Sequence, residues 1–116
     1  MEPTYRYDLG LLDQTANVLL QAANEYDILP HYAIKANNNP LLLDVLRKPG
    51  IGIDCVSGEE VLHALDNGFA PMTILLAGAG KTYFDLEVAV RNGIGCIHVE
   101  NLGELDIIDN LASKYG

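Results

Sequence analysis

One lysine in an apolar segment is the residue of this sequence most suited to chemistry. Lys35 follows His31-Tyr32-Ala33-Ile34, a run whose apolar character predicts a β-strand. Burying an ammonium group is costly, so we expect the pKa of Lys35 to be lowered. An amine with a lowered pKa can form a Schiff base with an aldehyde. The alternative is a lysine whose stem lies along apolar surface while its ammonium group reaches water.

Further polar residues follow other apolar runs of similar length. Four such runs, at 31–36, 51–56, 73–78 and 95–100, are separated by amphipathic segments of helical periodicity. This alternation predicts βαβ units and a parallel sheet, in which the carboxyl ends of the strands form the site. His98, inside the fourth run, could face the interior of a barrel. The residues expected near this edge are Lys35, Asp54, Ser57, Glu60, Lys81 and Glu100.

The segments between the runs carry helix start and stop signals. The predicted starts are at Asp8, Pro40, Ser57, Thr82 and Asn101. The predicted stops are Pro49-Gly50, Asn67-Gly68 and Asn92-Gly93. Ser57 and Glu60 have the spacing of a capping box, so each has a structural interpretation beside a functional one.

Two other folds and one other motif compete with a barrel and its lysine site. A leucine-rich solenoid lacks its Leu/Asn framework here, and a doubly wound sheet stays open as an alternative. Gly78-Ala79-Gly80-Lys81-Thr82 is similar to part of a phosphate-binding loop, but Leu75 stands where that loop needs glycine. His31 and His63 are interpreted as structural.

Composition limits the possible partners. The chain has 116 residues and a net charge of −9, which argues against nucleic acid and anionic membrane surfaces. It has no apolar run of roughly 20 residues to span a bilayer, and its start lacks the pattern of a signal peptide. Cys55 and Cys96 sit in apolar runs, so we predict reduced, buried thiols and a cytoplasmic protein. No Cys/His spacing suggests a metal site.

Tyr32-Ala33-Ile34-Lys35-Ala36-Asn37 resembles the Schiff-base lysine motif of the fold-type III pyridoxal-phosphate decarboxylases. This family includes the diaminopimelate, ornithine and arginine decarboxylases. Segments 54–60, 76–81 and 98–101 resemble further motifs of the family in the same order, and residues 3–8 resemble its opening strand. The form Ser57-Gly58-Glu59-Glu60 is most similar to the diaminopimelate branch, which typically has glycine at the place of Glu59.

The resemblance implies a (β/α)8 TIM barrel of the alanine racemase and ornithine decarboxylase type. Residues 1–116 would form its N-terminal half, a partial cofactor-binding domain. Residues 1–8 would be a leading strand that joins a C-terminal β domain outside this chain. A half-barrel exposes its inner face and two sheet edges, so we expect self-association, a complementary half or a longer polypeptide.

The resemblance also implies the chemistry of the site. Lys35 would be the catalytic residue and would hold pyridoxal 5′-phosphate, with Asp54 and Glu60 as cofactor-binding residues. The further candidates are Ser57, Lys81, His98 and Glu100. The substrate would be a small amino acid and the full-length protein a homodimer. Because the rest of the site would lie beyond Gly116, the isolated chain is expected to be inactive.

Three other functions stay open at this point. Ornithine or arginine could replace diaminopimelate as the substrate. A single-barrel, racemase-like protein that binds the same cofactor would lack the β domain. A non-catalytic, doubly wound binding module belongs to a different class and gives Lys35 no special role.

Overall fold

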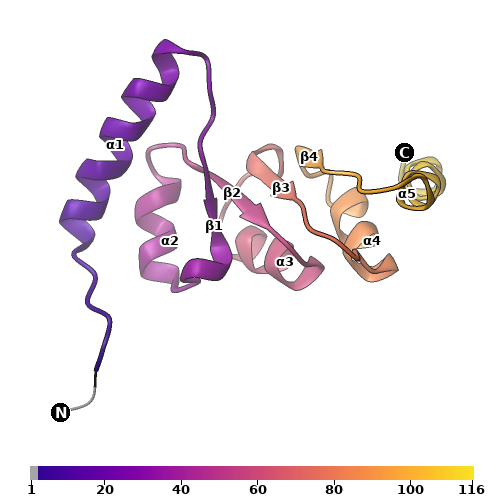
Figure 1. Ribbon diagram of the computed structural model, residues 1–116, viewed down its shortest axis with the longest axis horizontal. Helices are drawn as coiled ribbons and strands as arrows, with labels where there is room; N and C mark the ends of the chain where they lie inside the picture. Colours follow the sequence, from indigo (N-terminus) through magenta and orange to yellow (C-terminus); the bar gives the residue numbers. More distant parts are fainter. Residues whose placement is uncertain (1–2) are drawn as a thin grey trace.

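The protein folds around a four-stranded parallel sheet with its helices arranged beside it (Figure 1). It is described by a computed structural model, in which residues 3–116 are placed. The strand order is β1-β2-β3-β4, so each strand pairs with the next one along the chain. The elements are α1 (Leu9–Glu25), β1 (His31–Ala33), η1 (Ile34–Ala36), α2 (Pro40–Arg47), β2 (Gly52–Cys55), α3 (Gly58–Asp66), η2 (Pro71–Thr73), β3 (Ile74–Leu76), α4 (Tyr83–Arg91), β4 (Cys96–Ile97) and α5 (Leu102–Tyr115). The predicted α/β alternation with parallel strands is confirmed.

One face of the sheet forms the main core. Ile53 pairs with Ile74, and Cys55 pairs with Leu76, across β2 and β3, and all four side chains are almost fully buried. They belong to one cluster with apolar side chains of α2, α3 and α4. The helical members are Leu43, Val61, Ala64, Val88 and Ala89. This burial of β-strand residues against helical stripes is the main stabilising contribution expected for such a layer.

A second, smaller cluster holds α1 against α2. Ala16 of α1 packs with Leu42 and Leu46 of α2 and with Ile51 just before β2. α1 therefore lies at the β1 end of the molecule, while α5 lies at the β4 end (Figure 1).

The other face of the sheet carries a row of four side chains outside the core. Ala33, Asp54, Leu75 and Cys96 are register partners across the four strands. Residues that pair in this way point to the same face, opposite to their neighbours in the strand. The first three are half-buried, and Cys96 is exposed. We call this set the inner row, because it would line the interior of a closed barrel.

The predicted helix starts are confirmed. The N-caps of the five helices are Asp8, Asn39, Ser57, Thr82 and Asn101. Pro40 occupies the first turn of α2, where its missing N–H costs nothing. Two of the predicted stops hold in detail: Gly68 and Gly93 have φ values of 87° and 63°, which glycine adopts without strain.

The strands are shorter than the predicted apolar runs. Lys35 was expected on a strand but lies on η1, because the pairing of β1 with β2 ends at Ala33 and Asp54. His98 was expected inside the fourth strand, yet β4 ends at Ile97. Apolar composition marks burial, and burial continues beyond the last ladder pair of a short strand.

The predicted leading strand is not formed in residues 3–8, which are exposed and without regular secondary structure. Residues 1 and 2 lie outside the described part of the chain. Pairing of this segment with a C-terminal β domain stays a prediction.

The two cysteines differ in exposure. Both are reduced, and Cys55 is buried as predicted. The prediction is wrong for Cys96, which is exposed because it belongs to the inner row on the edge strand β4. Within residues 3–116, no helix combines the length and apolar character needed to cross a bilayer.

Candidate active site at the carboxyl ends of the strands

A cavity of about 670 Å³ lies beside Lys35, where β1 ends. One wall is the turn that carries Lys35, and another is the start of α3, which contributes Glu59, Glu60 and His63. Lys35 is exposed, whereas its neighbour Ile34 is 1% exposed and anchors the turn in the core. The cavity combines an amine, two carboxylates and an imidazole, which are groups able to bind a charged ligand and to move protons.

The turn that carries Lys35 is held by two hydrogen bonds to backbone carbonyls. The hydroxyl of Tyr32 donates to the carbonyl oxygen of Asn37 at 3.1 Å. Nε2 of His63 lies 2.9 Å from the carbonyl oxygen of Asn38. A carbonyl oxygen only accepts, so Nε2 of His63 carries a proton in this contact. Burial raises the pKa of Tyr32, which keeps its hydroxyl protonated and able to donate.

The turn between β2 and α3 is fixed by Glu60 and Ser57. Oε1 of Glu60 accepts a hydrogen bond from the N–H of Val56 at 2.8 Å. Oγ of Ser57 accepts one from the N–H of Glu60 at 3.2 Å. The predicted capping box is therefore half formed, because the carboxylate binds the residue before the N-cap instead of the N-cap itself. The carboxyl group that fixes this turn belongs to a residue that also lines the cavity.

Asp85 joins the starts of α3 and α4. Its Oδ1 accepts from the N–H of Gly58 and its Oδ2 from the N–H of Thr82, each at 2.8 Å. Oγ1 of Thr82 accepts from the N–H of Asp85 in return, which completes a capping box. Burial by itself raises the pKa of Asp85, but the hydrogen bonds from Gly58 and Thr82, with the charge of Lys81, hold it below its usual value.

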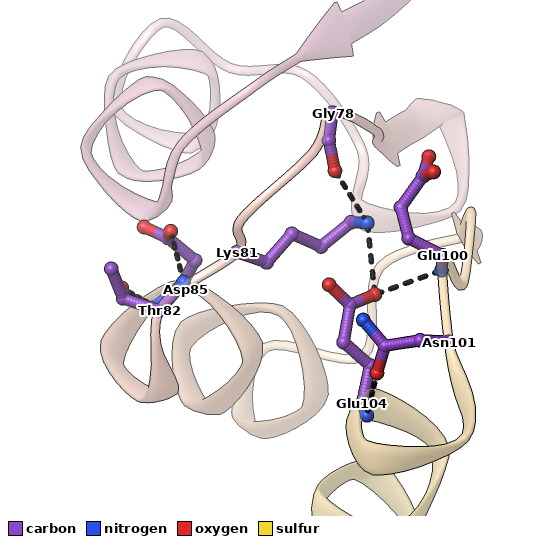
Figure 2. A network of polar contacts seen from close by, with 7 residues as sticks. All are labelled: Gly78, Lys81, Thr82, Asp85, Glu100, Asn101 and Glu104. Carbon is purple, nitrogen blue, oxygen red and sulfur yellow. Dashed lines mark hydrogen bonds and ion pairs between the residues drawn. The ribbon is translucent and has the colours of Figure 1, made fainter.

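Lys81 lies in a buried ion pair with Glu104 (Figure 2). Its Nζ is 3.1 Å from Oε1 of Glu104 and donates to the carbonyl oxygen of Gly78 at 2.8 Å. The same carboxylate oxygen accepts from the N–H of Glu100 at 2.9 Å. The hydrogen bond from Glu100 and the contact with Lys81 outweigh burial and lower the pKa of Glu104.

Three strand-to-helix turns share the same kind of hydrogen bond, from a backbone N–H of the turn to a carboxylate of the helix. The third residue of the helix is acidic in α3 (Glu60), α4 (Asp85) and α5 (Glu104), and each carboxylate accepts a backbone N–H of the turn before it. N–H groups at a helix start have no partner inside the helix, so such acceptors stabilise the turn. In α2 the third position is Leu42, and its turn is the one that carries Lys35.

Among the predicted site residues, one lines the cavity beside Lys35 and two lie on the neighbouring strand and its turn. Glu60 shares the cavity with it. Asp54 lies on β2, the strand that neighbours β1, and belongs to the inner row. Ser57 is half-buried at the N-cap of α3, where its hydroxyl group accepts the hydrogen bond from Glu60.

Other predicted residues lie apart from the cavity. Lys81 is used in its ion pair. His98 and Glu100 are exposed beyond β4, at the opposite edge of the sheet from β1. The contact that joins Glu100 to the network of Figure 2 comes from its backbone N–H.

Sequence reasoning interpreted His63 as structural only, although it lines the cavity, and it did not single out Asp85 or Glu104. His63 follows Glu60 by three residues, which places both on one side of a helix. Glu104 follows the cap Asn101 by three residues, so the capping signal was readable. Asp85 gives a less visible signal, because the usual capping box has Glu or Gln at this position.

Neither a metal nor a thiol chemistry is supported by the described residues. Across residues 3–116, no group of three or more His, Cys, Asp or Glu side chains is arranged to hold a metal ion. Burial, with the charges of Glu60 and Asp54, raises the pKa of Cys55 to about 12. Its thiol therefore stays protonated near neutral pH and is a poor nucleophile.

A parallel sheet with an amine and acids at its carboxyl edge is suited to holding a cofactor through a lysine. The chain belongs to the pyridoxal-dependent decarboxylases, and its residues 12–115 match the pyridoxal binding domain of that family. Diaminopimelate decarboxylase from Bacteroides thetaiotaomicron is 39% identical over 112 residues, which are 96% of this chain and 29% of the relative.

Solved structures agree with this assignment. The structure of diaminopimelate decarboxylase from Helicobacter pylori complexed with L-lysine matches with a TM-score of 0.84 and 33% identity, over 98% of this chain and 29% of that one. Ornithine decarboxylase from Entamoeba histolytica matches with a TM-score of 0.72 and 29% identity, over 87% and 30%. The fold is that of the first part of these enzymes, and the chain spans less than a third of their length.

The residues present fit pyridoxal 5′-phosphate. This cofactor needs an amine that bonds to its aldehyde and an acidic partner for its ring. Lys35 offers the amine beside a cavity with room for a ligand. Oδ1 of Asp54 is buried and lacks a hydrogen-bond partner within the described chain. Such an oxygen is costly to leave unsatisfied, which points to a donor supplied from outside this segment.

The lowered pKa values of Asp85 and Glu104 predict a loss of stability in acid. A carboxyl whose folded pKa is depressed stabilises the fold above its unfolded value, and this contribution disappears as pH falls toward the folded value. The free energy of unfolding should therefore decrease once pH drops below the ordinary values of 4.5 for Glu104 and 3.8 for Asp85. Denaturant titrations between about pH 7 and pH 2 measure this change.

The variant Asp85→Asn separates this effect from general acid denaturation. It should lower stability at neutral pH by about 1–3 kcal/mol, the usual worth of hydrogen bonds to a charged group, and should flatten the acid dependence. Asp109→Asn changes an exposed residue of α5 and serves as the matched control. An acid dependence equally steep in Asp85→Asn and Asp109→Asn would show that Asp85 is not the titrating group.

Proposed function

We propose that this chain is the cofactor-bearing part of a pyridoxal 5′-phosphate-dependent amino-acid decarboxylase. The whole protein would remove one carboxyl group of meso-diaminopimelate as CO2 and give L-lysine. The observation that carries this proposal is the place of Lys35, on a fixed turn beside a cavity with acidic walls. The names of the relatives support the choice of diaminopimelate.

The residues of this chain would divide the work at the site. Lys35 Nζ would hold the cofactor covalently, and the cofactor, when bound, supplies an electron sink for the pair left behind by the departing carboxylate. After the substrate amine has displaced it, Lys35 Nζ would be available to deliver a proton to the carbon that lost CO2. Asp54 would orient the cofactor through its carboxylate.

Glu60 would act from the start of α3. Its carboxylate is tied to the N–H of Val56, so it cannot swing freely toward a ligand. A carboxylate fixed in this way would attract a positively charged group of a substrate. Ser57, Lys81, His98 and Glu100 have no direct role at the cavity in this proposal.

The full-length protein would act in lysine biosynthesis, in the cytoplasm and as a homodimer. The acidic walls of the cavity suit a substrate that carries two amino groups. The exposed inner row and the open edges of the sheet suit a chain that is completed by further protein. With the chain alone, we expect binding of the cofactor without efficient decarboxylation.

Ornithine is the second candidate substrate, because an ornithine decarboxylase shares the fold. Both readings use Lys35 in the same way, so cofactor attachment alone does not separate them. Displacement of the cofactor from Lys35 by added amino acid does. Diaminopimelate should displace it at lower concentration than ornithine or arginine if the proposed substrate is correct.

The covalent role of Lys35 is tested by adding pyridoxal 5′-phosphate, reducing with borohydride and mapping the modified peptides by mass. We expect modification concentrated at Lys35 at low excess of cofactor, because the cavity holds the ligand beside that amine. Lys48 and Lys114 are internal controls on the surface. Lys35→Arg should lose the preferential modification while the controls keep theirs. Equal labelling of Lys35, Lys48 and Lys114 would refute the proposed role.

We predict that Asp54 lowers the free energy of unfolding of the cofactor-free chain while it contributes to cofactor binding. Asp54→Val places an apolar side chain between Ala33 and Leu75 of the inner row, and removes the buried oxygen that lacks a partner. We expect the free energy of unfolding of the cofactor-free chain to rise by on the order of 1 kcal/mol, and the labelling of Lys35 to fall. The measurements are denaturant titration and the mapping described above.

The control for Asp54→Val is Asp109→Val, which removes an equal charge from an exposed helical position. It should leave the labelling of Lys35 unchanged, and it should not raise the free energy of unfolding. If Asp54→Val destabilises the chain and leaves labelling intact, Asp54 is a structural residue and its proposed role is wrong.

A further inference from the structure

The turn that carries Lys35 is built differently from the other turns at this edge of the sheet. In α3, α4 and α5, an acid at the third helical position accepts an N–H of the preceding turn. α2 has Leu42 at that position, and the N–H of its N-cap Asn39 donates instead to Oδ1 of Asn37, inside the turn, at 2.9 Å. The cap Asn39 accepts only from the N–H of Leu41, inside α2.

Two side chains from other elements bind the same turn through its carbonyl oxygens. Tyr32 belongs to β1 and donates to the carbonyl oxygen of Asn37 at 3.1 Å. His63 belongs to α3 and donates through Nε2 to the next carbonyl oxygen, that of Asn38, at 2.9 Å. Two consecutive carbonyls are thus held from two elements, one on each side of the segment.

These contacts act on a short segment whose own side chains supply one hydrogen bond, from the N–H of Asn39 to Oδ1 of Asn37. η1 is a single 3₁₀ turn of three residues, and such turns are too short to be stable alone. Ile34 fixes its beginning through burial, whereas Lys35 and Ala36 are exposed. The return of the chain after Lys35 therefore depends on what binds the carbonyls of Asn37 and Asn38.

We propose that Tyr32 and His63 are positioning residues for Lys35, through the hydrogen bonds that each donates to the turn that follows it. This inference rests on the proposed function, in which Lys35 holds the cofactor. His63 also lines the same cavity as Lys35. Its bond to Asn38 sets how far the Lys35 turn stands from the acids at the start of α3.

Both side chains act as donors in the observed geometry. Burial raises the pKa of Tyr32, so its hydroxyl stays protonated well above neutral pH. His63 donates through Nε2 whether the ring is neutral in that tautomer or charged. The hold on the turn is therefore a constant feature of the fold and needs no switch.

The test uses variants that remove one donor each. Tyr32→Phe removes the hydroxyl, and His63→Leu removes the imidazole. His63→Gln restores a donor at the position of Nε2 and is the rescue variant. The matched controls lose a similar bond far from Lys35: Tyr115→Phe loses a bond to Glu87, and Asn92→Leu loses a bond to Val88.

Two measurements are made on the chain and on each variant. The first is the rate at which pyridoxal 5′-phosphate modifies Lys35, read by borohydride trapping and peptide mapping. The second is amide hydrogen exchange of residues 34–39, read without cofactor. Circular dichroism and denaturant midpoints identify any variant whose fold as a whole has changed.

We expect Tyr32→Phe and His63→Leu to slow modification of Lys35 roughly three- to tenfold, which matches the usual net worth of one hydrogen bond. Exchange of residues 34–39 should rise by a similar factor in these two variants. His63→Gln should recover most of both values, and Tyr115→Phe and Asn92→Leu should resemble the parent chain. A purely structural role would lower the denaturation midpoint without a change confined to these residues.

The results distinguish a failure of the positioning inference from a failure of the proposed function. If Lys35 of the parent chain is modified preferentially but Tyr32→Phe and His63→Leu modify it at the parent rate, the positioning inference is wrong and the proposed function stands. If Lys35 of the parent chain shows no preference over Lys48 and Lys114, the proposed function fails and the inference falls with it. Unchanged exchange in residues 34–39 of both variants also overturns the inference.

Discussion

Backbone N–H groups at the start of each helix are the constraint on which this structure depends. A parallel sheet sends every strand into a turn and then into a helix, and the first N–H groups of that helix have no partner within it. Here the N-cap side chains accept N–H groups inside the helices, and an acid at the third helical position of α3, α4 and α5 accepts an N–H of the turn that leads into the helix. These carboxylates lie at the carboxyl edge of the sheet and tie adjacent units together through Gly58 and Lys81.

The same constraint explains why the turn of Lys35 stands out. An acid at the third position of α2 would bring a negative group to the turn that carries the reactive amine. The sequence has Leu42 there, and the turn is held through its carbonyls by Tyr32 and His63. Lys35 is thereby left accessible to the cavity, on a turn whose two ends are fixed. Asp54 adds a buried carboxylate oxygen on the neighbouring strand, with no partner within residues 3–116.

Much of the fold follows from local signals in the sequence. Helix starts were predictable at Asp8, Ser57, Thr82 and Asn101, because each places a side-chain acceptor directly before an apolar stripe. The strand ends were not predictable, because Ile34 is as buried as a strand residue although the ladder has already stopped at Ala33. Lys35 was identified from its motif, whereas His63 was not, because its contact with Asn38 joins residues 25 positions apart. Long-range contacts of this kind depend on how α3 packs against the sheet and leave no local pattern.

A crystal structure of the chain grown with pyridoxal 5′-phosphate would show whether Lys35 binds the cofactor. We expect electron density that continues from Nζ of Lys35 into the cavity bounded by Glu60 and His63. The bonds from Tyr32 to Asn37 and from His63 to Asn38 should be retained. Cofactor attached to Lys48 or Lys114, with Lys35 unmodified, would contradict the account.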